Sequence, residues 1–424
     1  MAKSKSKKIM LEDALVPVDE QPYQIPENWC WTFLSNVADW GSGGTPSRKN
    51  PDYYGGYIPW IKTGELEDGY IFDSEEKITE DAVAHSSAKL FPIDSVLIAM
   101  YGATIGKTAI LGIPATTNQA CACARCRDVL NNKYLFYYLR SQKDTFIAKG
   151  KGGAQPNISQ DIIRNHMIPL PPLAEQKRIV EQIESLFAKL DEAKEKAQEV
   201  IDGYEARNAA VYNDAFSGRL TAQWRKDNYK ENKWETKRFD EVADIKSNLV
   251  EPSNYLEFPH IAPDNIEKRT GILLDYHTIA EDGVKSGKHR FYAGQILYSK
   301  IRPYLSKVVM VDFDGLCSAD MYPIETKENT KYLLYYMLSD MFLEQASSAG
   351  SRSVLPKINQ KELSAIKVRI TSDEEQKEVV RILDYLLPMM QQVRDKAVQV
   401  VDNIDAIKKS ILAKAFRGKL GTNI

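Results

Sequence analysis

The residues most suggestive of chemistry lie at positions 97–110, where LIAMYGATIGKTAI ends an apolar run with Gly102, Gly106 and Lys107. A glycine-rich loop of this kind binds nucleotide phosphates when four residues separate its two glycines and a helix follows. Here only three residues separate the glycines, Tyr101 occupies the place of the first glycine, and the next residues, LGIPATT, contain helix breakers. The stretch therefore predicts a strand followed by a glycine turn, not a nucleotide site.

Two other groups of residues are typical of metal sites. Asp52 together with Glu75, Glu76 and Lys77 fits the acidic-pair-plus-lysine pattern of metal-dependent nucleases. That pattern is short, common by chance and not repeated in the second half of the chain. The stretch CACARC (121–126) concentrates cysteines, but no further Cys or His pair lies near enough to complete a four-ligand zinc site. We therefore expect buried strand cysteines, no metal ion and no cofactor.

The motifs of a DNA methyltransferase are also missing. Such enzymes carry an Asp/Asn-Pro-Pro-aromatic element, whereas Pro171 and Pro172 are flanked by leucines, and no cofactor-binding glycine motif is present. The isolated chain is predicted neither to methylate nor to cut DNA.

Composition is that of an ordinary globular protein. The 424 residues suffice for two or three domains, and 43% hydrophobic with 27% charged residues is a usual balance. No run of about 18 apolar residues could cross a membrane, and the basic start MAKSKSKK lacks the apolar core of a secretion signal. Five cysteines, an odd number, suit a reducing compartment such as the cytoplasm. A net charge of -2 does not decide on nucleic-acid binding, because local basic patches matter more than the sum.

The strongest signal is an internal repeat with an offset of 200 positions. The tripeptide EQK at 175–177 recurs at 375–377, and AFSGRL at 215–220 recurs as AFRGKL at 415–420. Two copies are too few for a solenoid, which needs three or more. The repeat therefore predicts a duplicated protein with pseudo-twofold symmetry.

The repeat also bears on the glycine turn. At the same offset Lys107 falls on Lys307, whereas Gly102 and Gly106 fall on Arg302 and Ser306. A phosphate loop would require the glycines, while a lysine that contacts a nucleic-acid backbone from beside a strand would not. The recurring lysine favours a nucleic-acid contact, and an ordinary surface lysine is the alternative.

Each copy ends in a long helical stretch with a coiled-coil pattern. From Glu175 to Ala215, and again 200 positions later, apolar residues follow a 4-3 rhythm for more than four heptads. Each helix has one stripe that needs a partner, and a pseudo-twofold relation would pair the copies as an antiparallel coiled coil. Two amphipathic helices packed into separate cores are the alternative. The predicted seam consists of Ile179, Ile183, Leu186, Leu190, Val200, Val379, Leu383, Leu386, Met390, Val393, Val400 and Ile404.

Two globular segments mix short β-rich runs with short helices, which predicts an α+β fold for each. Their loops combine glycines, cations and tyrosines, and this favours nucleic-acid binding over ordinary solvated loops. The expected organisation is an N-terminal tail at 1–23, a first globular domain at 24–172, a helical region at 173–218, a linker at 219–231, a second globular domain at 232–370, a second helical region at 371–418 and a C-terminal tail at 419–424.

With these features the chain closely resembles the specificity subunits of Type I restriction-modification systems. The resemblance is carried by GSGGTPSRKNPDYYGGYIPWIKTGEL (41–66), GATIGK (102–107), TNQA (117–120) and GAQPNISQDIIRNHMIPLPPLAEQKRIVEQI (153–183). It covers essentially the whole chain and includes the order of the repeats. It implies two target recognition domains in pseudo-twofold repeat, each reading one half of a split DNA target. It also implies that the two helical regions set the gap and carry methyltransferase subunits. The second domain departs from the motifs, since it has no GGTP element and no clear counterpart of TNQA.

The partners implied by the resemblance are double-stranded DNA, two methyltransferase (modification) subunits and, in the full complex, restriction subunits, without a membrane. Arg, Asn, Gln and Lys read base edges in the major groove, while lysines and loop amides hold phosphates. A metal-dependent nuclease and a coiled-coil scaffold that does not touch DNA are the alternative functions. The candidate DNA contacts are Thr45, Ser47, Arg48, Lys62, Lys107, Lys151, Gln155 and Asn157 in the first half, and Lys246, Arg290, Lys300, Arg302, Lys307, Arg352 and Lys357 in the second.

Overall fold

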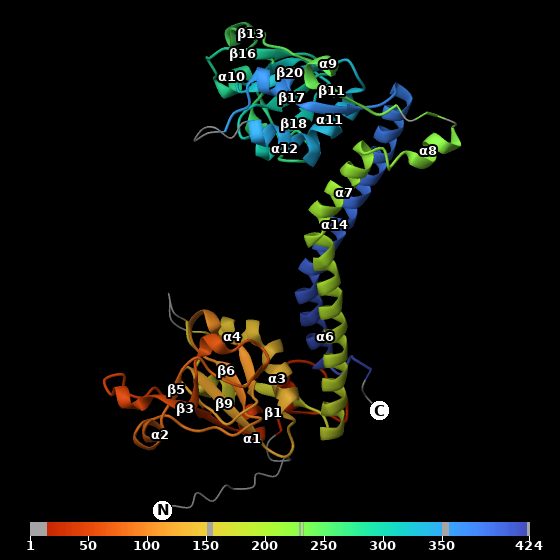
Figure 1. Cartoon of the computed structure of the whole chain (residues 1–424). Helices are drawn as coiled ribbons and strands as arrows, with labels where there is room; N and C mark the ends of the chain where they lie inside the picture. Colours follow the sequence, from red (N-terminus) through yellow and green to blue (C-terminus); the bar gives the residue numbers. More distant parts are fainter. Residues whose placement is uncertain (1–14, 151–155, 229, 232, 350–355, 422–424) are drawn as a thin grey trace, which may run out of the picture. The chain divides into compact units, whose positions relative to one another are not determined.

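The chain folds into two compact units. The computed structural model describes residues 15–150, 156–228, 230–231, 233–349 and 356–421. The first unit extends to Lys196 and resumes at Val400, and the second runs from Ala197 to Gln399. Each unit joins one α+β domain to parts of two long helices, α6 (Leu173–Asp202) and α14 (Asp373–Ala415) (Figure 1).

The first unit is built on a five-stranded sheet. Its elements are β1 (Cys30–Phe33), α1 (Leu34–Val37), β2 (Ala38–Ser42), β3 (Tyr54–Ile61), β4 (Tyr70–Ile71), β5 (Lys77–Ile78), α2 (Glu80–His85), β6 (Val96–Ala99), β7 (Thr108–Leu111), β8 (Thr116–Thr117), β9 (Cys121–Cys126), α3 (Asn132–Ser141), α4 (Lys143–Lys149), α5 (Gln160–Arg164) and β10 (Met167–Leu170). The strand orders are β2-β9-β6-β7-β4, β5-β3-β8 and β1-β10. All four residues of β6 and of β7 are buried, as expected for strands in the middle of a covered sheet.

The second unit repeats this plan. Its elements are α7 (Tyr204–Phe216), α8 (Ala222–Asp227), β11 (Glu235–Arg238), α9 (Phe239–Val242), β12 (Ala243–Ile245), β13 (Leu249–Val250), β14 (Pro259–Ile261), β15 (His277–Thr278), α10 (Ile279–Asp282), β16 (Lys288–Phe291), β17 (Ile296–Ser299), β18 (Val308–Met310), β19 (Gly315–Cys317), β20 (Met321–Thr326), α11 (Thr330–Leu338), α12 (Asp340–Ala349), α13 (Gln360–Ser364) and β21 (Lys367–Ile370). The strand orders are β12-β20-β17-β18, β13-β16-β19-β14-β15 and β11-β21.

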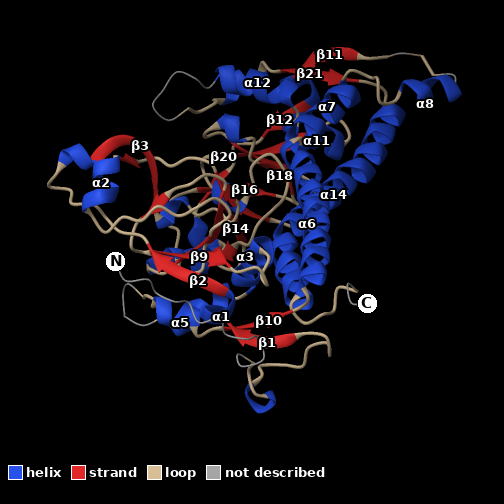
Figure 2. Cartoon of the chain, turned by 90° about the horizontal axis from the view of Figure 1, so that it is seen from below, coloured by secondary structure: helices blue, strands red, loops and turns tan. Residues whose placement is uncertain are grey.

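The repeat extends to strand register. Trp60 on β3 pairs in parallel with Thr116 on β8, and His260 on β14 pairs in parallel with Leu316 on β19. Both members of the second pair lie 200 positions after those of the first. The expected α+β fold and duplication are confirmed, and Figure 2 distinguishes the helices from the strands.

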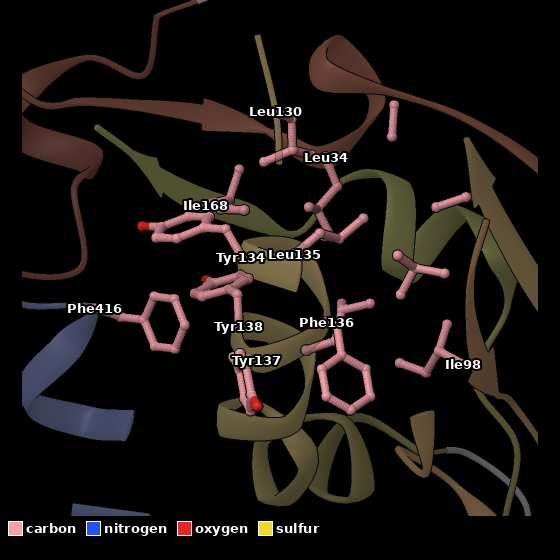
Figure 3. Close-up of a cluster of buried hydrophobic side chains, with 14 of the residues drawn as sticks. Leu34, Ile98, Leu130, Tyr134, Leu135, Phe136, Tyr137, Tyr138, Ile168 and Phe416 are labelled. Atoms are coloured by element: carbon pink, nitrogen blue, oxygen red, sulfur yellow. The ribbon is translucent and has the colours of Figure 1, made fainter. Parts of the chain in front are cut away.

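The core of each domain is completed by a helix of the other repeat. Phe416, directly after α14, places its ring centre 5.2 Å from that of Tyr134 and 5.1 Å from that of Tyr138, both on α3 (Figure 3). In the second unit Phe216, at the end of α7, contacts two of the three tyrosines of α11, with ring centres 5.3 and 4.9 Å apart. The recurring Ala-Phe pair therefore anchors each helix end in the domain built from the other copy.

The helices pair within each unit. In the first, Lys408 of α14 lies 2.5 Å from Asp191 of α6. In the second, the Tyr204 hydroxyl at the start of α7 donates to Gln391 at 2.5 Å, whereas the end of α7 shares a core with Val379. The direction in the second unit is thus antiparallel, and α7 runs beside α14 in Figures 1 and 2.

The first helical stretch is interrupted once, between α6 and α7, at Gly203. The Arg207 guanidinium lies against this glycine and donates to the backbone oxygen of Val200 at 2.6 Å. A Cβ at position 203 would come within 2.7 Å of the guanidinium, so the absence of a side chain permits this contact. The single helix expected from the 4-3 rhythm is therefore two helices separated by one residue.

Most predicted seam residues are turned inward. Val393 and Val400 are the exceptions, since they are 48% and 43% exposed, and the predicted seam is wrong at these two positions. The buried members are Ile179, Ile183, Val379, Leu383 and Ile404, and the half-buried members are Leu186, Leu190, Val200, Leu386 and Met390.

Long cationic side chains of α14 pack on aromatic rings of the paired helices. The Arg394 guanidinium lies 5.3 Å from the ring centre of Tyr204, and the Lys408 ammonium lies 5.2 Å from that of Phe187. Arg394 lies three residues before the buried Ala397, and Lys408 lies four residues after the buried Ile404. Both cations therefore fit the 4-3 spacing as well as the two valines do. The methylene stems of Arg and Lys cover apolar surface, so a seam drawn only through apolar residues misses them.

No helix among the described residues combines the length and apolarity that crossing a membrane requires.

Candidate nucleic-acid interface

The glycines of the first-domain turn are required by its backbone conformation and close packing. Gly102 and Gly106, in the loop between β6 and β7, have φ values of +64° and +79°, in the left-handed region that favours glycine. The Gly102 amide donates to the backbone oxygen of Pro156 at 2.8 Å. A Cβ at Gly106 would lie 2.8 Å from the Cγ of Lys143. The next element, β7, is a strand, so the prediction of a strand and a turn is confirmed.

The loop between β17 and β18 keeps the same backbone without glycine. Arg302 and Ser306 have φ values of +49° and +43°, and the Arg302 amide donates to Pro356 at 2.8 Å. The contacts 102–156 and 302–356 are thus equivalent. Although the glycines do not recur in the sequence, the conformation that they permit does.

The two aligned lysines of these loops have different surroundings. Lys307 is tied into its own domain, because its ammonium donates to the backbone oxygen of Pro263 at 2.7 Å and lies 3.5 Å from Asp264. Within the described part of the chain, the Lys107 ammonium has no hydrogen bond, ion pair or ring contact. Lys107 is therefore available to a ligand in a way that Lys307 is not.

A second cluster of candidates surrounds Arg48. Its Nη2 donates to Glu76 at 2.8 Å, and its guanidinium lies 4.3 Å from the ring centre of Tyr54 and 5.3 Å from that of Trp60. The hydrogen bond from Arg48 lowers the pKa of the Glu76 carboxyl. Lys62 also approaches Glu76, at 3.6 Å. The cluster holds Arg48 against two aromatic faces with its orientation set.

Two of the motifs that carry the resemblance meet near this cluster. The Thr45 hydroxyl donates to the Gln119 side chain, and the Gly44 amide donates to Thr117 at 2.9 Å. A Cβ at Gly43 would lie 1.9 Å from the backbone oxygen of Thr117, so the GGTP element needs glycine to approach TNQA. The other first-domain candidates are the exposed Ser47 and Asn157, which forms an isolated β-bridge with Tyr101.

The cations predicted in the second domain are mostly engaged. Lys246 lies 2.8 Å from Glu325, and the Arg290 guanidinium lies 4.9 Å from the ring centre of Tyr292. Lys300 donates to the backbone oxygen of Ala319 at 2.6 Å, and Lys357 donates to Asp320 at 3.2 Å. Three further candidates, Lys151, Gln155 and Arg352, lie outside the described residues.

The repeated EQK motif is structural. Gln176 accepts from the Asn131 amide at 2.8 Å and donates to the backbone oxygens of Val129 and Pro171, both at 2.9 Å. Gln376 accepts from Asn329 in the second unit in the same way, at 3.1 Å. The glutamine fixes the start of each long helix to the start of the domain helix, α3 or α11. The sequence identified this glutamine only by its recurrence at an offset of 200 positions. Its structural role is evident from the hydrogen bonds.

The acidic residues of the nuclease alternative do not gather. Glu76 is engaged by Arg48, and Lys77 pairs with Asp73 at 3.0 Å. In the described ranges no group of three or more His, Cys, Asp or Glu side chains is arranged to hold a metal ion. Burial raises the pKa of the Cys123 thiol to about 12, which keeps this side chain protonated in the metal-free protein.

A family model described as "Type I restriction modification DNA specificity domain" matches residues 26–201 and again residues 231–396. The chain belongs to this family. It is the DNA specificity subunit of a Type I restriction-modification system, a component that is itself non-catalytic. The two matches correspond to the two repeats, each with a recognition domain and the beginning of its long helix.

Individual relatives agree with this assignment. The chain is 39% identical over 314 residues to the Type I restriction enzyme EcoDI specificity subunit of Escherichia coli, a match that covers 69% of this chain and 71% of the relative. It is 25% identical over 426 residues to the MjaIX specificity subunit of Methanocaldococcus jannaschii, with 94% of each chain covered. In fold it is similar to the crystal structure of the HsdS subunit from Thermoanaerobacter tengcongensis, with a TM-score of 0.70, 20% identity, and 95% and 100% of the two chains covered. The chain thus functions within a Type I assembly, and its DNA specificity entails DNA binding.

Proposed function

We propose that the chain binds a bipartite DNA target, with the recognition domain at 24–172 reading one half-site and that at 232–370 reading the other. The observation that carries the proposal is the pair of equivalent loops, β6–β7 and β17–β18. Their backbones match at the 102–156 and 302–356 contacts, while their side chains differ. Equivalent frames with different side chains are what two readers of unlike sequences require.

Cations held against aromatic rings support DNA contact in both domains. Arg48 is positioned over Tyr54, and Arg290 over Tyr292. A guanidinium whose orientation is already set loses little conformational entropy when it binds a phosphate or a guanine edge. The remaining candidate residues would contribute phosphate contacts that fix the position of each domain on the duplex.

The long helices are proposed to dock two methyltransferase subunits. Along α14, Tyr385, Met389 and Val393 in the second unit are 66%, 50% and 48% exposed, and Val400 and Ile407 in the first are both 43% exposed. Apolar side chains at helical spacing that face solvent in both units fit helix-on-helix docking of a protein partner. Restriction subunits would join the methyltransferase in the full cytoplasmic complex, and the helices would set the gap between half-sites.

The test is a methylation map of genomic DNA from a host that expresses this chain with its modification subunit. We expect new methylation at a split motif with a fixed gap. Replacing Val393 by Lys should reduce assembly with the modification subunit. The matched substitution of Ala206, an exposed alanine on α7, should have little effect. A contiguous motif, or no new methylation when the complex assembles, would refute the bipartite proposal.

A further inference from the structure

The two recognition domains differ in which position of the equivalent loops carries a cationic side chain without a bonding partner among the described residues. In the β6–β7 loop it is Lys107, and in the β17–β18 loop it is Arg302, whose side chain also makes no hydrogen bond, ion pair or ring contact with any described residue. The counterpart of Lys107 is the engaged Lys307, and the counterpart of Arg302 is Gly102. The unpartnered cation therefore lies at the end of the loop in the first domain and near its start in the second.

Arg302 has an unusual backbone for its residue type. Its φ of +49° is left-handed, a conformation that disfavours residues with a Cβ. It also precedes Pro303, and helical backbone is disfavoured before proline. The conformation is enforced by neighbours, because the Arg302 amide donates to Pro356 at 2.8 Å and its oxygen accepts from Leu305 at 2.9 Å.

Packing does not explain why arginine occupies this position. The side chain is exposed, and at the equivalent Gly102 a Cβ would meet nothing within 4 Å. Glycine would satisfy the backbone, as it does in the first domain. A strained residue with a free, exposed side chain suggests that the side chain has a role outside the fold.

The cations next to Arg302 are bonded to other residues, so Arg302 is the cation of this loop surface (residues 300–307 and 357) that can contact a base. Ile301 forms a β-bridge with Lys357, so the two loops that flank Arg302 are joined. Lys357 and Lys300 are both oriented toward Asp320, at 3.2 and 3.6 Å. They contribute positive potential to the rim, but their ammonium groups are already engaged.

We propose that Arg302 is a specificity-determining residue of the second recognition domain. Its guanidinium donates to the O6 and N7 atoms of a guanine in the major groove of the second half-site. In the first domain Lys107, at the other end of the equivalent loop, takes a phosphate contact. The inference rests on the proposed bipartite function and adds a named residue and base to it.

The test uses the full chain assembled with its modification subunits and a duplex carrying the methylation-mapped target. Arg302→Ala and Arg302→Gly both remove the guanidinium. Each should weaken binding about 10-fold or more and abolish discrimination at one G·C pair of the second half-site, with the first half-site read as before. The two variants should differ in stability, because only glycine relieves the left-handed backbone. Arg302→Gly should melt about 2–4 °C above Arg302→Ala.

Arg269 offers a matched control. It is also an exposed arginine with a left-handed φ, +62°, but it lies 4.0 Å from Asp340. Arg269→Ala should leave base discrimination unchanged. Lys107→Ala should weaken binding equally for all bases and reduce its salt dependence.

Three results would overturn the inference. Unchanged discrimination in Arg302→Ala would remove its role as a reader. A loss of affinity that is equal for every base pair would make Arg302 a phosphate contact. Loss of discrimination in Arg269→Ala as well would mean that general charge, not position 302, is responsible. If no split motif is mapped at all, the bipartite function itself fails, which is a separate outcome.

Discussion

Acidification should destabilise the first unit through His166. This side chain is 8% exposed, with its Nε2 3.4 Å from the Tyr138 hydroxyl and its Nδ1 3.3 Å from the Lys149 ammonium. Burial, together with the Lys149 charge, lowers the pKa of the imidazole to about 4. In the second unit the equivalent residue is Ile366, which is buried and apolar.

The expected loss follows from the difference between the folded and unfolded pKa values. In the unfolded chain the imidazole has its ordinary pKa of about 6.5. As the pH falls from 6.5 toward 4, the unfolded state takes up a proton that the folded state does not bind, so stability decreases and then levels off. The loss is about 1.4 kcal/mol per pH unit and about 3 kcal/mol in total, of which about 2 kcal/mol falls between pH 7 and 5.

His166→Ile should flatten this dependence. Hydrogen exchange of α3, which carries Tyr138, reports the opening free energy of the first unit, and α11 serves as the internal reference. Between pH 7 and 5, after correction for intrinsic exchange rates, the α3 opening free energy of the variant should fall about 2 kcal/mol less than that of the wild type. His85→Gln, at an exposed position on α2, should leave the wild-type dependence intact. Parallel pH profiles for wild type and His166→Ile would show that His166 is not the source of the acid sensitivity.

Two further predictions concern the helices. Phe416→Ala should destabilise the first unit by about 3–5 kcal/mol, because its ring is 1% exposed and fills the core beside the α3 tyrosines. Exchange in α3 should rise while α11 is unaffected, and an equal rise in both would contradict the assignment of Phe416 to one unit. One heptad inserted between Ala193 and Lys196, matched by another in α14 after Ile404, adds about 10 Å of helix. Methylation mapping should then give unchanged half-sites with a gap altered by about three base pairs, and a changed half-site would count against the proposal that the helices set only the gap.

Periodicity and repetition were sufficient to predict the general plan. The recurrence of EQK and of the Ala-Phe pair indicated two like halves, and the 4-3 rhythm indicated two long helices. These features are local or depend only on comparing the chain with itself. The three-residue spacing of Gly102 and Gly106 likewise excluded a nucleotide loop, and the strand β7 does follow that turn.

The contacts of individual side chains could not be predicted in this way. Val393 satisfied the apolar rhythm and yet is exposed, because Arg394 packs on a tyrosine from another helix. Lys107 and Lys307 align in the sequence, but Pro263 engages only the second of them. Whether a cation is engaged depends on which distant residue lies beside it.

The duplication, the α+β class, the two helical stretches and the family resemblance could be predicted from the sequence alone, since each is encoded in residues close together or at a constant offset. The packing of Phe416 in the core of the first domain and the left-handed backbone of Arg302 became evident only in the folded chain. Both depend on contacts across long separations, the first with α3 and the second with the backbone oxygen of Pro356. Residue type permits such contacts, but the packing of the whole unit selects them.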